Sequence, residues 1–193
     1  KNIMNNIKTL CVAASAIIFS LAGCKGNKAI TPTQQGEVRI VEFCTGPDYT
    51  SNSKTFRATG TGTSISSEAA KKMASSNAYA ALAKSISSTM KIVGDNYVNS
   101  TKFNGKEEIT ETFNDMAKTI VDQELRGAVT ICTELTQKPD GSYKYYTAIE
   151  LSGEQIAQAY NERLSQDERI KADYNYDNFK KTFDEEMERR RNE

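Results

Sequence analysis

The chain has 193 residues, carries 25 basic and 25 acidic side chains, and contains neither histidine nor tryptophan. Its balanced charge argues against a general nucleic-acid-binding protein, which has a basic excess or a basic stripe. The absence of histidine removes the commonest general base and the commonest transition-metal ligand. We therefore expect one domain of modest size that is not an enzyme, has no metal site and needs no cofactor.

The start of the chain has the pattern of a bacterial export signal. Lys1 and Lys8 lie in a polar, positively charged stretch, and residues 10–21 are apolar or small throughout. About a dozen such residues suit a signal-peptide core, and they are too few to span a bilayer as a helix. We expect residues 1–23 to be a signal peptide.

The apolar run ends in Leu21, Ala22, Gly23 and Cys24. This string resembles a lipobox, the processing site of bacterial lipoproteins. The resemblance implies a diacylglyceryl thioether on the Cys24 sulfur, cleavage after Gly23 and acylation of the new amino terminus. Lys25, rather than an acidic residue, follows the cysteine, which by resemblance to Gram-negative lipoproteins implies the outer membrane. A plain secretory signal with a cysteine near its end is the alternative.

A tether and two strands are expected next. Residues 24–36 are polar, contain glycine and proline, and show no period, so we expect a flexible tether. Residues 37–44 and 55–63 are rich in β-branched and aromatic side chains, which favours strands.

The strongest local pattern is that of a long helix. Small and apolar side chains recur at three- and four-residue spacing over residues 66–93, and Gly94 is expected to end the helix. Gly60 and Gly62 share one face of the preceding strand. Glycine in a strand often marks the close approach of another backbone, so we expect the alanine-rich helix to lie tightly against this face.

The second half of the chain predicts a helix, a β-hairpin and two more helices. The helix is expected over residues 107–124, and the hairpin strands over 128–137 and 142–151, joined by a proline-glycine turn. This order predicts an α+β fold, in which a small antiparallel sheet is packed by the long helix. We expect the α+β domain to cover residues 37–155 and a helical C-terminal extension to cover residues 156–193.

Several short segments, in this order, resemble one known family. They are Ala58-Thr59-Gly60-Thr61-Gly62 before the alanine-rich helix, Leu125-Arg126-Gly127-Ala128-Val129 before the hairpin, and Asp140-Gly141-Ser142-Tyr143 and Ala148-Ile149-Glu150-Leu151 within it. Over roughly residues 55–155 the chain looks like the Lpp-twenty-type family of bacterial lipoproteins, which includes FlgP-like flagellar members. The resemblance implies a lipid-anchored, non-enzymatic envelope protein. It transfers no functional residue except Cys24.

Two cysteines remain once Cys11 leaves with the signal peptide and Cys24 is lipidated. Cys44 and Cys132 both lie on expected strands of an exported chain, where disulfides form and persist. They either form a disulfide or stay as separate, half-buried thiols.

Three other groups of residues are weaker candidates for a site. Thr61, Thr63 and Ser64 at a helix start can contact a small anion, although a tight strand-to-helix turn with a good cap is the simpler explanation. Tyrosines on the hairpin suggest either an aromatic binding surface or cross-strand packing: Tyr143, Tyr145 and Tyr146. The acidic residues after position 183 and the arginines at 189–191 suggest a solvated helix face or a contact with anionic lipid or a partner.

The leading functional prediction is a lipid-anchored, non-catalytic envelope lipoprotein that acts as a structural or interaction module, with an envelope protein or a second copy as its partner. The alternative is an anchored periplasmic carrier that holds a small ligand in a groove between the long helix and the sheet. An enzyme with a histidine-free carboxylate or cysteine site is the weakest prediction.

Overall fold

The computed structural model describes residues 40–191 of the chain. The expected signal peptide, the lipobox with Cys24 and the tether lie outside the described residues. The three strands are β1 (Thr55–Ser64), β2 (Val129–Gln137) and β3 (Tyr143–Ser152), and they form an antiparallel sheet in the order β1-β3-β2. The helices are α2 (Ser67–Ser100), α3 (Lys106–Glu124), α4 (Gly153–Leu164) and α5 (Tyr176–Arg191). The expected α+β class is confirmed.

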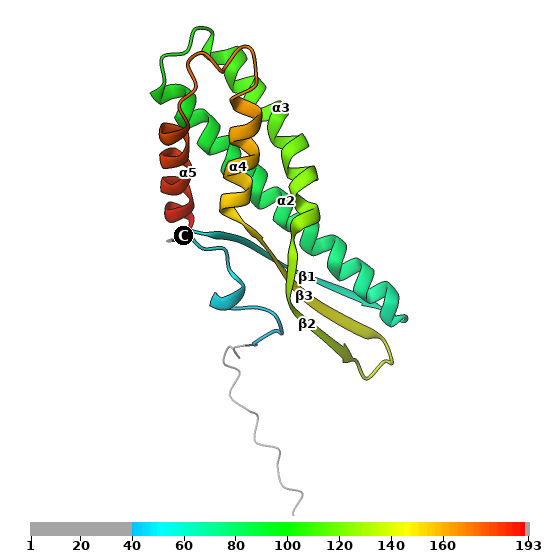
Figure 1. The fold of residues 1–193 in the computed structure, drawn as a ribbon. Helices are drawn as coiled ribbons and strands as arrows, with labels where there is room; N and C mark the ends of the chain where they lie inside the picture. The colour runs from blue at the N-terminus through cyan, green and yellow to red at the C-terminus, as the bar shows by residue number, and fades with distance from the viewer. Residues whose placement is uncertain (1–39, 192–193) are drawn as a thin grey trace, which may run out of the picture. The chain divides into compact units, whose positions relative to one another are not determined.

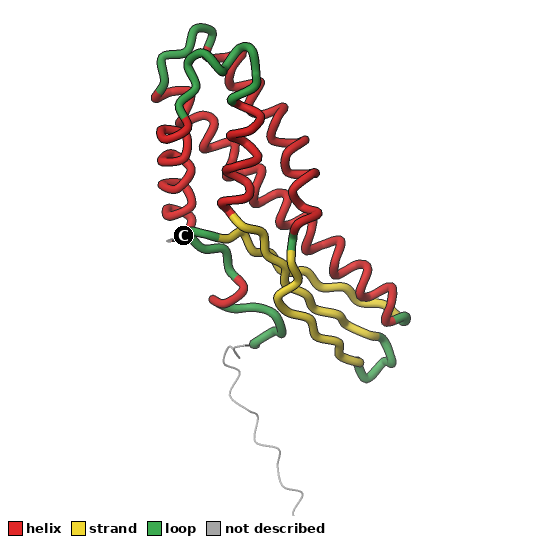
Figure 2. The backbone as a smooth tube through the Cα atoms, viewed as in Figure 1, coloured by secondary structure: helices red, strands yellow, loops and turns green. Residues whose placement is uncertain are grey.

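The long helix α2 belongs to two layers of the structure. Its N-terminal half lies over the sheet, and its C-terminal half lies beside α3, α4 and α5 (Figures 1 and 2). Ser66 caps the helix, because its hydroxyl accepts a hydrogen bond from the backbone N–H of Ala69.

The contact between β1 and α2 depends on glycine. A Cβ atom added to Gly60 would overlap the carbonyl oxygen of Ala74, and one added to Gly62 would overlap that of Ala70. Ala70, Ala74 and Ala78 of the helix are fully buried. The expected close approach of the alanine-rich helix to the glycine face of the strand is therefore confirmed.

The prediction that Gly94 ends the long helix is wrong, because α2 continues to Ser100. Gly94 is buried where α2 meets α3, and a Cβ atom there would lie 3.2 Å from Cδ1 of Phe113. Glycine lowers helix propensity by about 1 kcal/mol relative to alanine. The packing of Phe113 against Gly94, and the burial of Tyr97 beyond it, offset this cost.

The expected strand over residues 37–44 is not found in its described part, residues 40–44. This segment lies over the face of the sheet opposite α2, where a backbone cannot pair with a strand edge. Phe43 packs edge-to-face on Tyr146, and Cys44 is buried with Tyr146 and Ala148. Cys44 also has φ of 56°, which no regular strand adopts.

The C-terminal helices contribute to the same core as the sheet. Phe183 of α5 contacts Phe56 of β1 with ring centroids 6.5 Å apart. Ile156 and Tyr160 of α4 are fully buried in that cluster. One end of the sheet is thereby covered by residues that follow position 155.

Candidate functional site: a cavity at the free edge of β1

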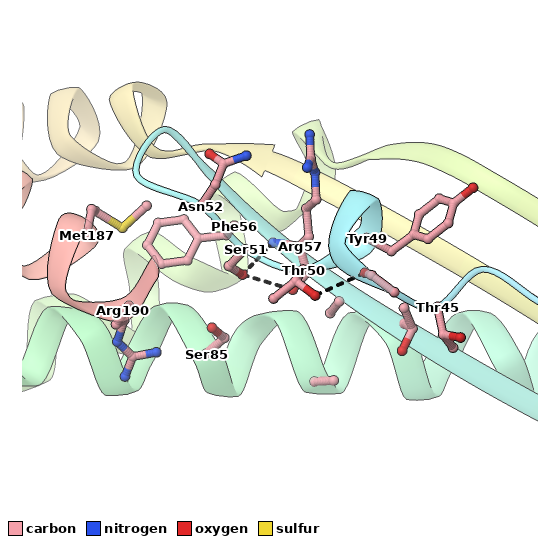
Figure 3. A pocket seen from close by; sticks show the side chains of 14 residues that line it. Thr45, Tyr49, Thr50, Ser51, Asn52, Phe56, Arg57, Ser85, Met187 and Arg190 are labelled. Carbon is pink, nitrogen blue, oxygen red and sulfur yellow. Dashed lines mark hydrogen bonds between the residues drawn. The ribbon is translucent and has the colours of Figure 1, made fainter. Parts of the chain in front are cut away.

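A cavity of about 520 Å³ lies between β1, α2, α5 and residues 45–52 (Figure 3). Its walls come from segments that are far apart in the sequence: the chain before β1, the middle of α2 and the last turns of α5. Cavities of this size are typical of small-molecule sites.

One wall of the cavity is the free edge of β1, and side chains cap most of this edge. The Ser51 hydroxyl accepts the N–H of Arg57 at 2.9 Å and donates to its carbonyl oxygen at 3.1 Å. The Asn77 amide donates to the carbonyl oxygen of Thr61 at 2.8 Å. Backbone groups that face outward alternate along an antiparallel strand, so those of Thr59, between the two caps, also face outward. Thr59 lines the cavity.

The floor of the cavity is apolar. Phe56 and Met187 lie side by side at one end of it, and both side chains are nearly inaccessible to solvent (Figure 3). Ala58 of β1 and Ala81 of α2 also line the cavity. Small side chains at these two positions leave the space open.

A buried ion pair lies on α5, adjacent to Met187 in the sequence. The Glu186 side chain is only 2% exposed, and both of its carboxylate oxygens accept hydrogen bonds from Arg189, at 2.8 and 2.9 Å. Arg190, which lines the cavity, makes one longer contact of 3.4 Å from Nε to Glu186 and donates from Nη2 to the Ser88 hydroxyl at 3.0 Å.

The outer wall, residues 45–52, is held by a disulfide and by local hydrogen bonds. The structure joins Cys44 to Cys132 across a sequence separation of 88 residues, with Cα atoms 5.6 Å apart. The Thr50 hydroxyl donates to the carbonyl oxygen of Gly46 at 3.0 Å. The cysteine pairing that was one of two alternatives from the sequence therefore fixes a wall of the cavity.

The structure does not bring the three expected anion contacts together at one site; they are Thr61, Thr63 and Ser64. Strand alternation places the side chains of Thr61 and Thr63 on the face opposite α2, where both are exposed. The Ser64 hydroxyl accepts the backbone N–H of Ser66. This arrangement matches a capped strand-to-helix turn.

The three hairpin tyrosines are divided between the two faces of the sheet. Tyr146 is buried on the disulfide side, between Phe43 and the ammonium group of Lys144, which lies 4.7 Å from its ring centroid. Tyr143 and Tyr145 alternate with it on the α2 side and are half-buried.

The burial of Glu186 is not among the predictions from the sequence, although the spacing of residues along α5 indicates it. The acidic residues of α5 were interpreted together as a solvated face. Glu186, however, follows Phe179 by seven residues and Phe183 by three, so it lies on the apolar stripe. The arginines that follow it by three and four residues are placed to pair with a carboxylate there.

Comparisons with models of known protein families and with curated proteins found no match to this chain. The family resemblance described from the sequence stays a prediction. Within residues 40–191, no helix is long and apolar enough to cross a membrane, and no group of three or more acidic or thiol side chains is placed to hold a metal ion.

Proposed function

We propose that the chain is a lipid-anchored, non-catalytic protein of the bacterial cell envelope, most simply of the outer membrane, whose α+β domain is a structural or interaction module. The lipobox-like Leu21-Ala22-Gly23-Cys24 string supports the anchor. The observation that carries the interaction role is a difference between the two edges of the sheet.

The edge of β1 is capped, and the edge of β2 is open. On β1, Ser51 occupies both outward backbone groups of Arg57, and Asn77 occupies the outward carbonyl oxygen of Thr61, so that only those of Thr59 stay open between the two caps. Among the described residues no strand pairs with the outer edge of β2, and Val129 and Leu135 of this strand are 60% and 46% exposed. An uncapped strand edge can accept a strand from a partner protein or from a second copy of the chain.

A serine at position 24 tests the anchor. Cys24→Ser should leave an uncleaved chain that takes up no labelled fatty acid in growing cells. Cys11→Ser is the matched control, because this cysteine lies in the expected signal peptide and should be dispensable. Fatty-acid labelling of the Cys24→Ser chain would contradict the proposed anchor.

Proline on β2 tests the interaction role. By the ladder alternation the N–H of Thr133 points outward, so Thr133→Pro should keep the fold and block the addition of a strand. Crosslinks formed in native envelopes from a photoreactive side chain at Leu135 should then disappear. A photoreactive side chain at Thr63 on the capped strand is the control and should give few crosslinks. Equal crosslinking from both strands contradicts the role of the open edge.

The second candidate function is an anchored carrier of a small ligand, and the cavity at the edge of β1 favours it. The groove expected between the long helix and the sheet is filled at its centre, where Gly60 contacts Ala74. Open space remains further along, between Phe56 of β1 and Ser85 of α2.

A further inference from the structure

The open edge of β2 and the strand-like segment before Cys44 both lack a pairing partner among the described residues. We propose that residues 37–41 of one copy add as a strand to the β2 edge of a second copy, so that copies assemble head to tail. The proposal rests on the interaction role proposed above for this edge, and it names the partner.

The acceptor is the regular part of β2, residues 132–137. By the ladder alternation the backbone groups of Thr133, Leu135 and Gln137 point away from β3. β2 is an outer strand of the sheet (Figure 1), and within residues 40–191 no other strand pairs with this side of it. Natural sheets protect exposed edges with lysine, proline or a bulge. This stretch contains neither lysine nor proline, and the bulge of β2 lies before it, so the edge can accept a strand.

The donor is an apolar segment that is exposed in its own copy. The side chains of Ile40 and Val41 are 82% and 78% exposed, and that of Phe43 is 52% exposed. Residues 37–44 have the composition of a strand, yet residues 40–44 form no strand on their own sheet. Pairing with another copy would remove the apolar side chains of this segment from water.

A charge on the edge strand sets the register of the added strand. Glu134, the one charged residue of β2, is exposed and has no ion-pair partner among the described residues. Its ladder partner is Tyr146, so its side chain lies on the disulfide side of the sheet. The donor segment carries an arginine at its centre, Arg39. Opposite charges on adjacent strands stabilise a sheet, which favours Arg39 beside Glu134.

The same register covers an exposed leucine. Side chains alternate along a strand, so Val38 and Ile40 lie on the α2 side when Arg39 lies on the disulfide side. Leu135, next to Glu134 in β2, is on that α2 side and is 46% exposed. The added strand places Val38 opposite Leu135 if it runs antiparallel, and Ile40 if it runs parallel. Charge and apolar contact therefore favour one register.

The geometry of residues 42–44 favours pairing between copies over pairing within one chain. Glu42 is held on the middle strand by Lys144, with Oε1 and Nζ 2.9 Å apart, and Cys44 is bonded to Cys132. A strand added outside β2 lies two strand spacings, about 10 Å, from β3. At about 3.4 Å per residue, residues 39–41 would be used to cross that distance in their own chain. They are available as a strand only to another copy.

Photocrosslinking between two distinguishable copies tests the proposal. One full chain carries a photoreactive side chain at Ile40, and a co-expressed full chain carries an affinity tag. Crosslinks should join the two chains and map to residues 133–137 of the tagged chain. A photoreactive side chain at Ile65, which is 89% exposed and outside the donor segment, is the control and should give few crosslinks. Equal yields from both positions would overturn the proposal.

Proline in the acceptor distinguishes head-to-tail from symmetric pairing. Thr133→Pro in the tagged chain should lower the yield at least about tenfold, because the edge loses a donor and meets the proline ring. The same variant in the photoreactive chain should leave the yield unchanged. Equal loss from either chain would mean that two β2 edges pair with each other, which contradicts the proposal.

Charge reversal tests the register. Arg39→Glu in the photoreactive chain should lower the yield about threefold, because it sets like charges together. Glu134→Arg in the tagged chain should then restore it. Lys28→Glu, the same charge change in the expected tether, should have no effect. Equal losses from Arg39→Glu and Lys28→Glu, without restoration, would overturn the assigned pairing.

The outcomes also separate the partner from the interaction role. If Ile40 forms no crosslink between copies while Leu135 still crosslinks to another envelope protein, the partner assigned here is wrong and the interaction role stands. If neither position forms crosslinks, both are wrong.

Discussion

Tyr97 and Tyr160 pack on the same ring, that of Phe179, but their hydroxyl groups differ in hydrogen bonding. Tyr97 meets Phe179 edge-on at 5.8 Å between centroids, and Tyr160 stacks on it at 6.3 Å. The Tyr97 hydroxyl accepts the N–H of Asn175 at 2.9 Å and donates to its carbonyl oxygen. The Tyr160 hydroxyl is buried with no partner among the described residues. The two tyrosines therefore form a matched pair for measuring what a buried hydroxyl contributes.

Tyr160→Phe should raise the free energy of unfolding by about 1 kcal/mol, because it removes a buried polar group that makes no hydrogen bond. Urea denaturation followed by circular dichroism measures the change. A loss of stability in this variant would mean that the hydroxyl has a partner in solution, such as a buried water molecule.

Tyr97→Phe should lower the free energy of unfolding by about 0.5–1.5 kcal/mol under the same conditions, because both hydrogen bonds to Asn175 are lost. These bonds join the C-terminal part of α2 to the residue before α5. We expect hydrogen exchange of the first amides of α5 to accelerate in this variant and to stay unchanged in Tyr160→Phe. Equal effects in the two variants would contradict the assigned difference between the hydroxyls.

Stability should fall at alkaline pH. Burial raises the pKa of Tyr97, Tyr160 and Tyr174 above the ordinary tyrosine value. The folded chain keeps these protons at a pH where the unfolded chain, with a tyrosine pKa of about 10, releases them. The stabilisation of the folded chain that these raised pKa values provide is fully present below about pH 10 and is lost as the pH rises further. Tyrosinate absorbance for these residues should appear together with loss of helical circular dichroism; complete ionisation of all tyrosines in a chain that stays folded would contradict the prediction.

The regular elements follow from local signals, and the departures from them have tertiary causes. The hairpin could be predicted because Pro139 and Gly141 mark its turn between two alternating segments. The continuation of α2 through Gly94 could not, since it depends on Phe113 of another helix. Residues 40–44 have strand-like composition, but the disulfide at Cys44 and the ring of Tyr146 hold them over a sheet face.

The cavity was beyond sequence reasoning for a similar reason. Its lining includes residues 52, 85 and 190, and no period in the sequence relates them. The burial of Glu186 cannot be predicted from residue type alone, because a charged residue on an apolar stripe is buried only when cations such as Arg189 lie beside it.

Gly60→Ala should destabilise the fold by about 1–3 kcal/mol, because the added methyl group must displace the backbone of α2 near Ala74. Thr61→Ala is the control, because the Thr61 side chain is exposed on the other face of the same strand. Its removal should change the free energy of unfolding little. Thermal unfolding measures both. Similar melting temperatures for the two variants would contradict the close packing of β1 on α2.

Loss of the disulfide should lower stability by about 2–4 kcal/mol, because the bond closes a loop of 88 residues in the unfolded chain. Cys132→Ser and the double variant Cys44→Ser, Cys132→Ser should behave alike in urea denaturation, since neither can form the bond. Thiol titration of the denatured, unreduced protein should detect no reactive thiol from this pair. Two reactive thiols per chain would show that the cysteines are separate.

The same variants should also loosen the outer wall of the cavity. Cys44 immediately precedes residues 45–52, so without the bond this segment is held to the sheet mainly by Ser51 and by the ion pair of Glu42 with Lys144. Amide exchange should therefore accelerate in residues 45–52 and remain slow in α2, whose packing on β1 does not involve the disulfide. Uniform acceleration throughout the chain would instead indicate that the disulfide acts only on global stability.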